Sequence, residues 1–127
     1  MGQHSEADEL TEKIIGAAIE VHRNLGPGLL ESTYETCLAY ELETMGFIVQ
    51  RQLVLPVIYK GLQLPQAFRI DLLVEGQIVV EIKAVEELTE VHAAQVLSYL
   101  KFSGCKKGLL INFNVKLLKQ GIRRFVM

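Results

Sequence analysis

Three charged residues could carry chemistry in this chain: Asp71, Glu81 and Lys83. A nine-residue gap with one turn signal separates Asp71 from Glu81, and Lys83 follows within the apolar run 77–84. Such a run is typical of a strand buried on both faces, where an ionised Glu or Lys is costly unless it pairs or binds a metal ion. These charges therefore require a structural or a chemical explanation.

Side chains alternate faces along a strand, so Glu81 and Lys83 are expected on one face and Ile82 on the other. Two carboxylates that converge beside an ammonium group match the needs of metal-assisted phosphodiester hydrolysis. The carboxylates bind a hard divalent cation, while the lysine orients water or stabilises developing negative charge. The alternative is a buried Glu–Lys ion pair with Asp71 as an ordinary strand residue, and these three residues alone leave both open.

Length and composition favour a single globular domain spanning residues 1–127. The chain has 127 residues, of which 50% are hydrophobic, and this is enough for a core without disulfides or structural metal. No apolar stretch approaches the roughly 18 residues of a membrane span, and the N-terminus is polar and acidic rather than signal-like. We expect a soluble, cytoplasmic protein in which Cys37 and Cys105 are reduced.

Charge is distributed unevenly around the formal net charge of -2. Residues 1–50 carry nine acidic and two basic side chains, whereas residues 91–127 carry seven basic and no acidic ones. The basic segment could follow nucleic-acid phosphates, or it could balance the acidic helices within the fold. The charge pattern does not choose between these two interpretations.

Hydrophobic periodicity and turn residues predict the element order αα-βββ-α-β. Ser32 and Glu35 are expected to form a capping box for the second helix, and Pro56 should place its strand at a sheet edge or bend it. The order predicts an α/β fold with a mixed central β-sheet, a three-stranded antiparallel meander plus a parallel strand, flanked by helices. The expected helices are 9–25, 31–45 and 89–103, and the expected strands are 47–59, 62–74, 77–84, 107–113 and, as a short final strand, 122–126.

The loop between the second and third strands decides whether the two carboxylates meet. A two-residue loop, Glu75-Gly76, would send Asp71 and Glu81 to opposite faces of the sheet. A three-residue loop, Val74-Glu75-Gly76 with Gly76 in the left-handed conformation, would place Asp71 diagonally beside Glu81 on one face. A metal site therefore requires the three-residue loop or an equivalent bulge nearby.

The charged residues and the element order together resemble the PD-(D/E)XK nuclease superfamily, whose core is restriction-endonuclease-like. Asp71 is similar to the acidic residue of the superfamily motif, and Glu81 and Lys83 are similar to its (D/E)-x-K. Ile70 stands where the motif name has Pro, which relatives commonly lack. The segment 28–34 (GLLESTY) more narrowly resembles the signature of the GxxExxY proteins, and the likeness extends from the first helix to the C-terminus.

By this resemblance, Asp71 and Glu81 would hold Mg²⁺ or Mn²⁺ together with the backbone carbonyl of Ile82. Lys83 would position the attacking water. Glu31 matches an acidic residue on the helix before the meander, which in many relatives reaches the metal directly or through water. The alternative for Glu31 is a favourable interaction with the helix dipole and no chemistry.

The resemblance also suggests residues that contact the substrate. Gln95 and Tyr99 share a helix face and resemble the Gln-x-x-x-Tyr motif of exonuclease-like branches, where this pair lies beside the metal and contacts nucleic acid. Tyr34, one turn after Glu31, could bond a ligand phosphate. Each of the three could instead only pack or satisfy neighbouring backbone groups.

Together these features imply a divalent-metal-dependent nuclease that hydrolyses phosphodiester bonds of DNA, with Mg²⁺ or Mn²⁺ as cofactor. The sequence shows no recognition module, so sequence-specific cutting would need a homodimer or a partner protein. Two alternatives remain: a nucleic-acid-binding or assembly module that keeps the fold without cutting, and a structural protein with a buried ion-pair network.

Overall fold

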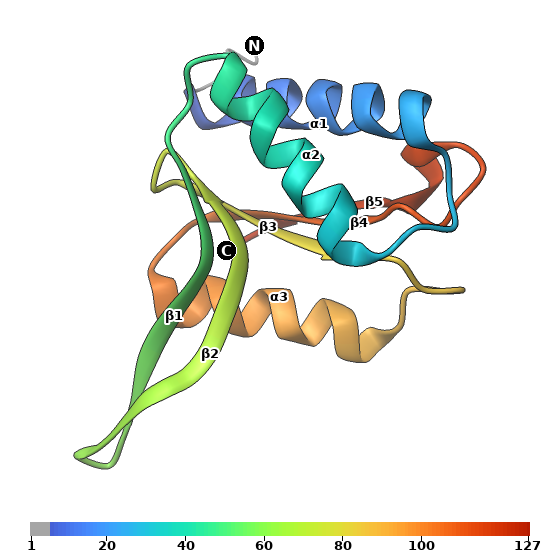
Figure 1. The fold of residues 1–127 in the computed structure, drawn as a ribbon. Helices are drawn as coiled ribbons and strands as arrows, with labels where there is room; N and C mark the ends of the chain where they lie inside the picture. Colours follow the sequence, from blue (N-terminus) through green and yellow to red (C-terminus); the bar gives the residue numbers. More distant parts are fainter. Residues whose placement is uncertain (1–5) are drawn as a thin grey trace, which may run out of the picture.

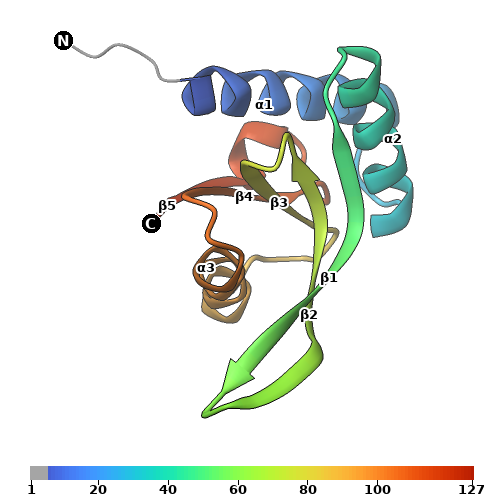
Figure 2. The same cartoon turned by 90° about the vertical axis from the view of Figure 1, so that its left-hand side faces the viewer.

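The computed structural model describes residues 6–127, in which helices cover both faces of a five-stranded sheet (Figure 1). A view turned by 90° shows α1 and α2 on one side of the sheet and α3 on the other (Figure 2). The helices are α1 (Glu6–Leu25), α2 (Glu31–Thr44), α3 (Glu90–Ser103) and the short 3-10 helix η1 (Leu118–Gly121). The strands are β1 (Val49–Tyr59), β2 (Leu62–Val74), β3 (Ile78–Lys83), β4 (Lys107–Asn112) and β5 (Ile122–Val126). The predicted fold class is therefore confirmed, and the predicted element order matches except for η1, which was not predicted.

The helix N-termini follow ordinary capping chemistry, with one exception. α1 begins with acidic residues that favour its dipole, and α3 begins with a capping box formed by Thr89 and His92. The predicted capping box of α2 is wrong, because its N-cap is Leu30, which makes no side-chain hydrogen bond there. Glu35 turns instead toward β1, where the amide of Gln52 donates to its carboxylate.

The sheet has the strand order β1-β2-β3-β4-β5. β1, β2 and β3 form the predicted antiparallel meander, β4 lies parallel to β3, and β5 is antiparallel to β4. β1 is an edge strand, and its pairing with β2 shifts between Leu55 and Val57, where Pro56 offers no N–H. Pro56 thus combines an edge position with an irregular pairing, and beyond it the β1–β2 hairpin projects past the helices (Figure 1 and Figure 2).

Side chains from the two faces of the sheet form two apolar layers. Tyr34 is fully buried in the layer under α1 and α2, and its ring stacks on Phe113 with centroids 4.5 Å apart. Burial of these side chains fixes β2 and β3 between the helices. The layer under α1 and α2 includes Leu72, Val80, Ile82 and Ile111, and the layer against α3 includes Ile70, Leu73, Val79 and Leu110.

No helix within residues 6–127 is long and apolar enough to cross a membrane.

The hairpin that joins β2 to β3 has three loop residues, as the metal-site hypothesis required, but the loop starts one residue later than predicted. Val74 pairs with Ile78, so residues 75–77 form the loop. Its first two residues both adopt positive φ values, 55° and 63°. This register brings Asp71 level with Glu81 rather than diagonal to it, and keeps both residues on one side of the sheet.

Candidate active site

Asp71 and Glu81 lie where β2 and β3 begin to separate. The last regular pair is Leu72 with Val80, and beyond it side chains replace the backbone ladder. The Asp71 N–H donates to Glu81 Oε1 at 3.3 Å, while the Ile82 N–H donates to Asp71 Oδ2 at 2.9 Å. Main-chain donors therefore hold both carboxylates at the same point of the sheet.

Glu81 is in an unfavourable place for a negative charge. Only 4% of its surface is exposed, and burial, followed by the negative charge of Asp71, raises its pKa from 4.5 to about 8. The hydrogen bond from the Asp71 backbone and the charge of Lys83 act in the opposite direction without outweighing burial. Lys83 Nζ lies 3.9 Å from Glu81 Oε2, at the limit of an ion pair. Burial and the charge of Asp71 therefore outweigh the stabilising charge of Lys83 at this carboxyl group.

A polar pocket of about 440 Å³ opens at this carboxylate pair. Glu31 reaches its rim from the first turn of α2, and the Glu31 carboxylate accepts a hydrogen bond from the Ala84 N–H at 3.3 Å, just beyond the end of β3. Six of the predicted site residues thus meet in one cavity. The lining residues are Glu31, Val54, Gln66, Phe68, Arg69, Asp71, Glu81, Lys83, Gln95 and Tyr99.

Gln95 and Tyr99 line the pocket from α3. Burial, and then the charges of Glu81 and Asp71, raise the pKa of the Tyr99 hydroxyl. The Tyr99 ring stacks on Phe68 of β2 with centroids 5.2 Å apart. Gln95 Oε1 is a buried acceptor without a hydrogen-bond partner, and no other side-chain atom within residues 6–127 shares that condition. Such an acceptor is available to a donor group of a ligand.

Tyr34 lies outside this pocket. Its hydroxyl donates to the Gly26 carbonyl oxygen at 2.6 Å and accepts from the Leu29 N–H at 3.1 Å, so it closes the loop between α1 and α2. The side chain is fully buried and offers no surface to a substrate, which supports the packing alternative over the predicted substrate contact. The Ile82 side chain also lies in the layer under α1 and α2, so only its backbone is placed to serve a metal ion.

Gln52 and Glu35 border the site although the sequence did not single them out for it. Gln52 lies opposite Asp71 in β1, and its amide donates to Asp71 Oδ1 at 3.3 Å. The same amide donates to Glu35 on α2. A Gln in an exposed strand and a Glu on a helix are both common residues, so neither position carries a signal. Only the docking of α2 on β1 connects them to the pocket.

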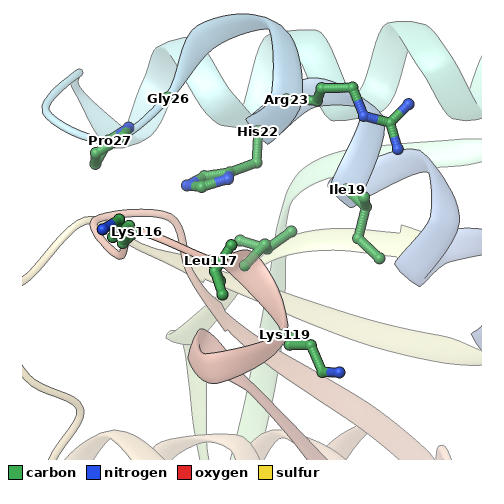
Figure 3. Close-up of a pocket in the computed structure, with 9 residues that line it drawn as sticks. Ile19, His22, Arg23, Gly26, Pro27, Lys116, Leu117 and Lys119 are labelled. Atoms are coloured by element: carbon green, nitrogen blue, oxygen red, sulfur yellow. The ribbon is translucent and has the colours of Figure 1, made fainter.

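A second cavity, of about 450 Å³, lies between the end of α1 and the connection from β4 to β5 (Figure 3). His22 Nε2 lies 2.7 Å from the Val115 carbonyl oxygen, so the ring ties α1 to this connection. Arg23 and Lys119 extend toward one side of the cavity, whereas Lys116 lies at the other (Figure 3). None of the described residues that line it is acidic. The cavity therefore offers no carboxylate to a hard cation, its imidazole, His22, is engaged with the Val115 carbonyl oxygen, and its cationic groups do not converge.

The donors of the first pocket suit a hard divalent cation. Asp71 and Glu81 offer carboxylate oxygens, and Glu31 lies in the same pocket. In the part of the chain that the structure describes, no three His, Cys, Asp or Glu side chains converge as a preformed metal cage. Mg²⁺ fits this arrangement, because it keeps several waters and needs only one or two carboxylates.

Comparison with known families agrees with this geometry. A family model described as the PD-(D/E)XK nuclease superfamily matches residues 8–125, so the chain belongs to that superfamily. Its nucleases typically use divalent metal ions, in keeping with the oxygen donors of the pocket. Membership of the narrower GxxExxY family stays a prediction, since the match is to the superfamily. No curated protein and no solved structure matches the chain.

Proposed function

We propose that this protein is a divalent-metal-dependent nuclease that hydrolyses phosphodiester bonds of DNA. The observation that carries the proposal is the meeting of Asp71 and Glu81 in a polar pocket beside Lys83. Superfamily membership supports the nuclease class. The DNA substrate, the metal ion and the activity are our inference.

In this proposal Asp71 and Glu81 hold Mg²⁺ or Mn²⁺ with the Ile82 carbonyl, and Glu31 contributes directly or through water. The bound ion would lower the pKa of water and neutralise phosphate charge. The raised pKa of Glu81 supports this role, because a bound cation would offset the burial and the Asp71 charge that disfavour its ionised form. A purely structural ion-pair network would instead hold Glu81 in its charged form.

The remaining residues of the pocket act on the water and the substrate. Lys83 shares the strand face of Glu81 and is only partly exposed, so its ammonium can orient the attacking water and stabilise the charge that develops on the phosphate. Gln95 and Tyr99 would contact the nucleic acid, because Gln95 Oε1 has no partner and Tyr99 lies one helical turn further along the same face. A second copy or a partner protein would have to supply sequence recognition.

Calorimetric titration with Mn²⁺ and cleavage of plasmid DNA test the proposal together. We expect the wild-type protein to take up Mn²⁺ and to cut DNA, and Glu81→Ala to lose both without loss of fold. Lys83→Ala should keep Mn²⁺ uptake but lose cleavage. Glu43→Ala and Lys101→Ala are matched controls, because both positions are exposed and lie outside the pocket.

The two measurements also separate the alternatives. Uptake of Mn²⁺ and binding of DNA without cleavage would favour the non-cleaving module over the nuclease. Failure of the wild-type protein to take up Mn²⁺ would overturn the proposal.

A further inference from the structure

Gln52 has an unusual backbone conformation for a residue inside a strand. Its neighbours Arg51 and Leu53 pair with β2 in a single register, which places Gln52 opposite Asp71, yet the φ angle of Gln52 is 51°. Residues other than glycine are disfavoured in this left-handed region, and a strand interior normally excludes it. The surrounding structure must therefore hold Gln52 in this conformation.

The side chain of Gln52 connects two carboxylates. Its amide nitrogen donates to Glu35 Oε1 at 2.5 Å and to Asp71 Oδ1 at 3.3 Å, which occupies both of its hydrogens. The opposite orientation of the amide would set its oxygen against two carboxylate oxygens. The two acceptors thus fix the direction in which the amide points.

Glu35 is a well-anchored end of the hydrogen-bonded bridge that runs from Glu35 through Gln52 to Asp71. It is 7% exposed, and Arg51 binds its other oxygen, Oε2, with N–O distances of 3.1 and 3.2 Å. Glu35 lies one helical turn after Glu31, so α2 supplies both the rim of the pocket and the anchor behind it. The bridge therefore connects a buried residue of the helix layer to the acidic pair.

The other end of the bridge is the Asp71 carboxylate. Its Oδ2 atom accepts from the Ile82 N–H, and its Oδ1 atom accepts from Gln52. Without the Gln52 amide, Oδ1 loses the hydrogen bond that ties it toward α2, and the Ile82 N–H and the neighbouring Glu81 side chain are what remain to hold the carboxylate. Gln52 does not line the pocket, so it acts on the site through its partners: directly through Asp71, and through Glu35 on the helix that carries Glu31.

We propose that Gln52 is a positioning residue that fixes the Asp71 carboxylate in the orientation needed to bind a divalent cation. The role of Gln52 in cation binding rests on the proposed metal-dependent function, whereas the hydrogen bonds of the bridge are independent of that function. Hydrogen bonds to ligating side chains commonly change metal affinity by roughly 10- to 100-fold. We therefore expect loss of the bridge to weaken metal binding without removing a ligand.

The test compares Gln52→Asn with Gln50→Asn. Asn tolerates a positive φ better than most residues but is too short to reach both carboxylates, so this change breaks the bridge and keeps the backbone conformation. Gln50 lies exposed on the same strand and makes no side-chain hydrogen bond within the described residues, which makes it a matched control. Gln52→Gly also removes the bridge, and glycine adopts a positive φ without steric cost. This variant therefore replaces Gln52→Asn in the test if the Asn variant folds poorly.

Three measurements report on the bridge. In the metal-free protein, exchange of the Ile82 amide hydrogen should accelerate by about 10-fold in Gln52→Asn, because its acceptor on Asp71 is less well held. By calorimetry, the Kd for Mn²⁺ should rise by roughly 10-fold, whereas the rate of DNA cleavage at saturating Mn²⁺ should largely recover. Gln50→Asn should leave all three quantities unchanged.

The outcomes distinguish this inference from the proposed function. A change in amide exchange or in Mn²⁺ affinity that is confined to the Gln52 variants supports the inference. Unchanged exchange and unchanged affinity in both Gln52 variants would overturn it. If the wild-type protein bound no Mn²⁺ but Ile82 exchange still accelerated, the proposed function would fail while the positioning of Asp71 would stand.

Discussion

The backbone N–H of Asp71 donates to the carboxylate of Glu81, so the main chain as well as their charges couples the two acidic residues of the site. Burial has the largest effect on the pKa of Glu81, the Asp71 charge comes next, and the hydrogen bond opposes both. The resulting pKa of about 8 makes this carboxyl group titrate above neutrality.

The metal-free protein should lose stability as the pH rises from about 5 to about 8. Glu81 gives up its proton near pH 4.5 in the unfolded chain but keeps it to about pH 8 in the folded protein, so rising pH favours unfolding. The resulting decrease in the free energy of unfolding is at most about 5 kcal/mol. Urea unfolding with a chelator present measures it, and Glu81→Gln, which cannot titrate, should remove most of the pH dependence. An equal dependence in Glu81→Gln would contradict this prediction.

Mn²⁺ binding should strengthen as the pH rises, because the ion and the proton compete for Glu81. Below about pH 8, release of one proton per ion corresponds to about a tenfold gain in affinity per pH unit. Calorimetry in buffers of different ionisation enthalpy counts the released protons, and the number should approach about one at pH 7. A number near zero would indicate that Glu81 is already ionised in the metal-free protein.

Gln95→Leu should weaken DNA binding without destabilising the fold. The change removes the buried Oε1 atom that lacks a partner, so the free energy of unfolding should stay the same or rise by up to about 1 kcal/mol. Bound DNA would lose the hydrogen-bond acceptor that Gln95 offers, so the Kd of the protein for DNA should increase by about 5- to 10-fold. Fluorescence anisotropy in a Lys83→Ala background measures binding without cutting. Gln63→Leu, exposed on the projecting hairpin, is the control, and equal affinities would exclude a substrate contact by Gln95.

Tyr34→Phe should cost about 1–3 kcal/mol of stability while DNA cleavage stays intact. The lost hydroxyl leaves the Gly26 carbonyl and the Leu29 N–H without their partner in a tight loop. Chemical unfolding and the plasmid assay measure the two effects on the same sample. Loss of cleavage at unchanged stability would instead restore Tyr34 as a substrate contact.

The sequence predicted the helices and strands well because their signals are local. Apolar periodicity marks α1, and the Gly26-Pro27-Gly28 turn ends it. The start of the β2–β3 loop was predicted one residue too early, because Glu75 adopts a positive φ, which few glutamates do. The predicted capping role of Glu35 was wrong because a tertiary contact with β1 competes for its carboxylate.

The candidate site shows the same division between local and distant information. Strand alternation was enough to predict that Glu81 and Lys83 share one face. Placing Asp71 on that face also required a three-residue loop, which the sequence left open beside the two-residue one. The bridge through Gln52 depends on how α2 docks against an edge strand, which no short stretch of sequence encodes. Tyr34 was hard to predict for a related reason, since its burial depends on Phe113 from the other end of the chain.

The acidic pair comes from strands joined by a three-residue loop, whereas α3 and the parallel partner β4 follow later in the chain. During translation, Asp71 and Glu81 can therefore meet before the ribosome has released the helix that carries Gln95 and Tyr99. A nascent chain at that stage would hold its two carboxylates together without the side of the pocket that α3 supplies. We expect the pocket to be completed only after its two carboxylates have been gathered.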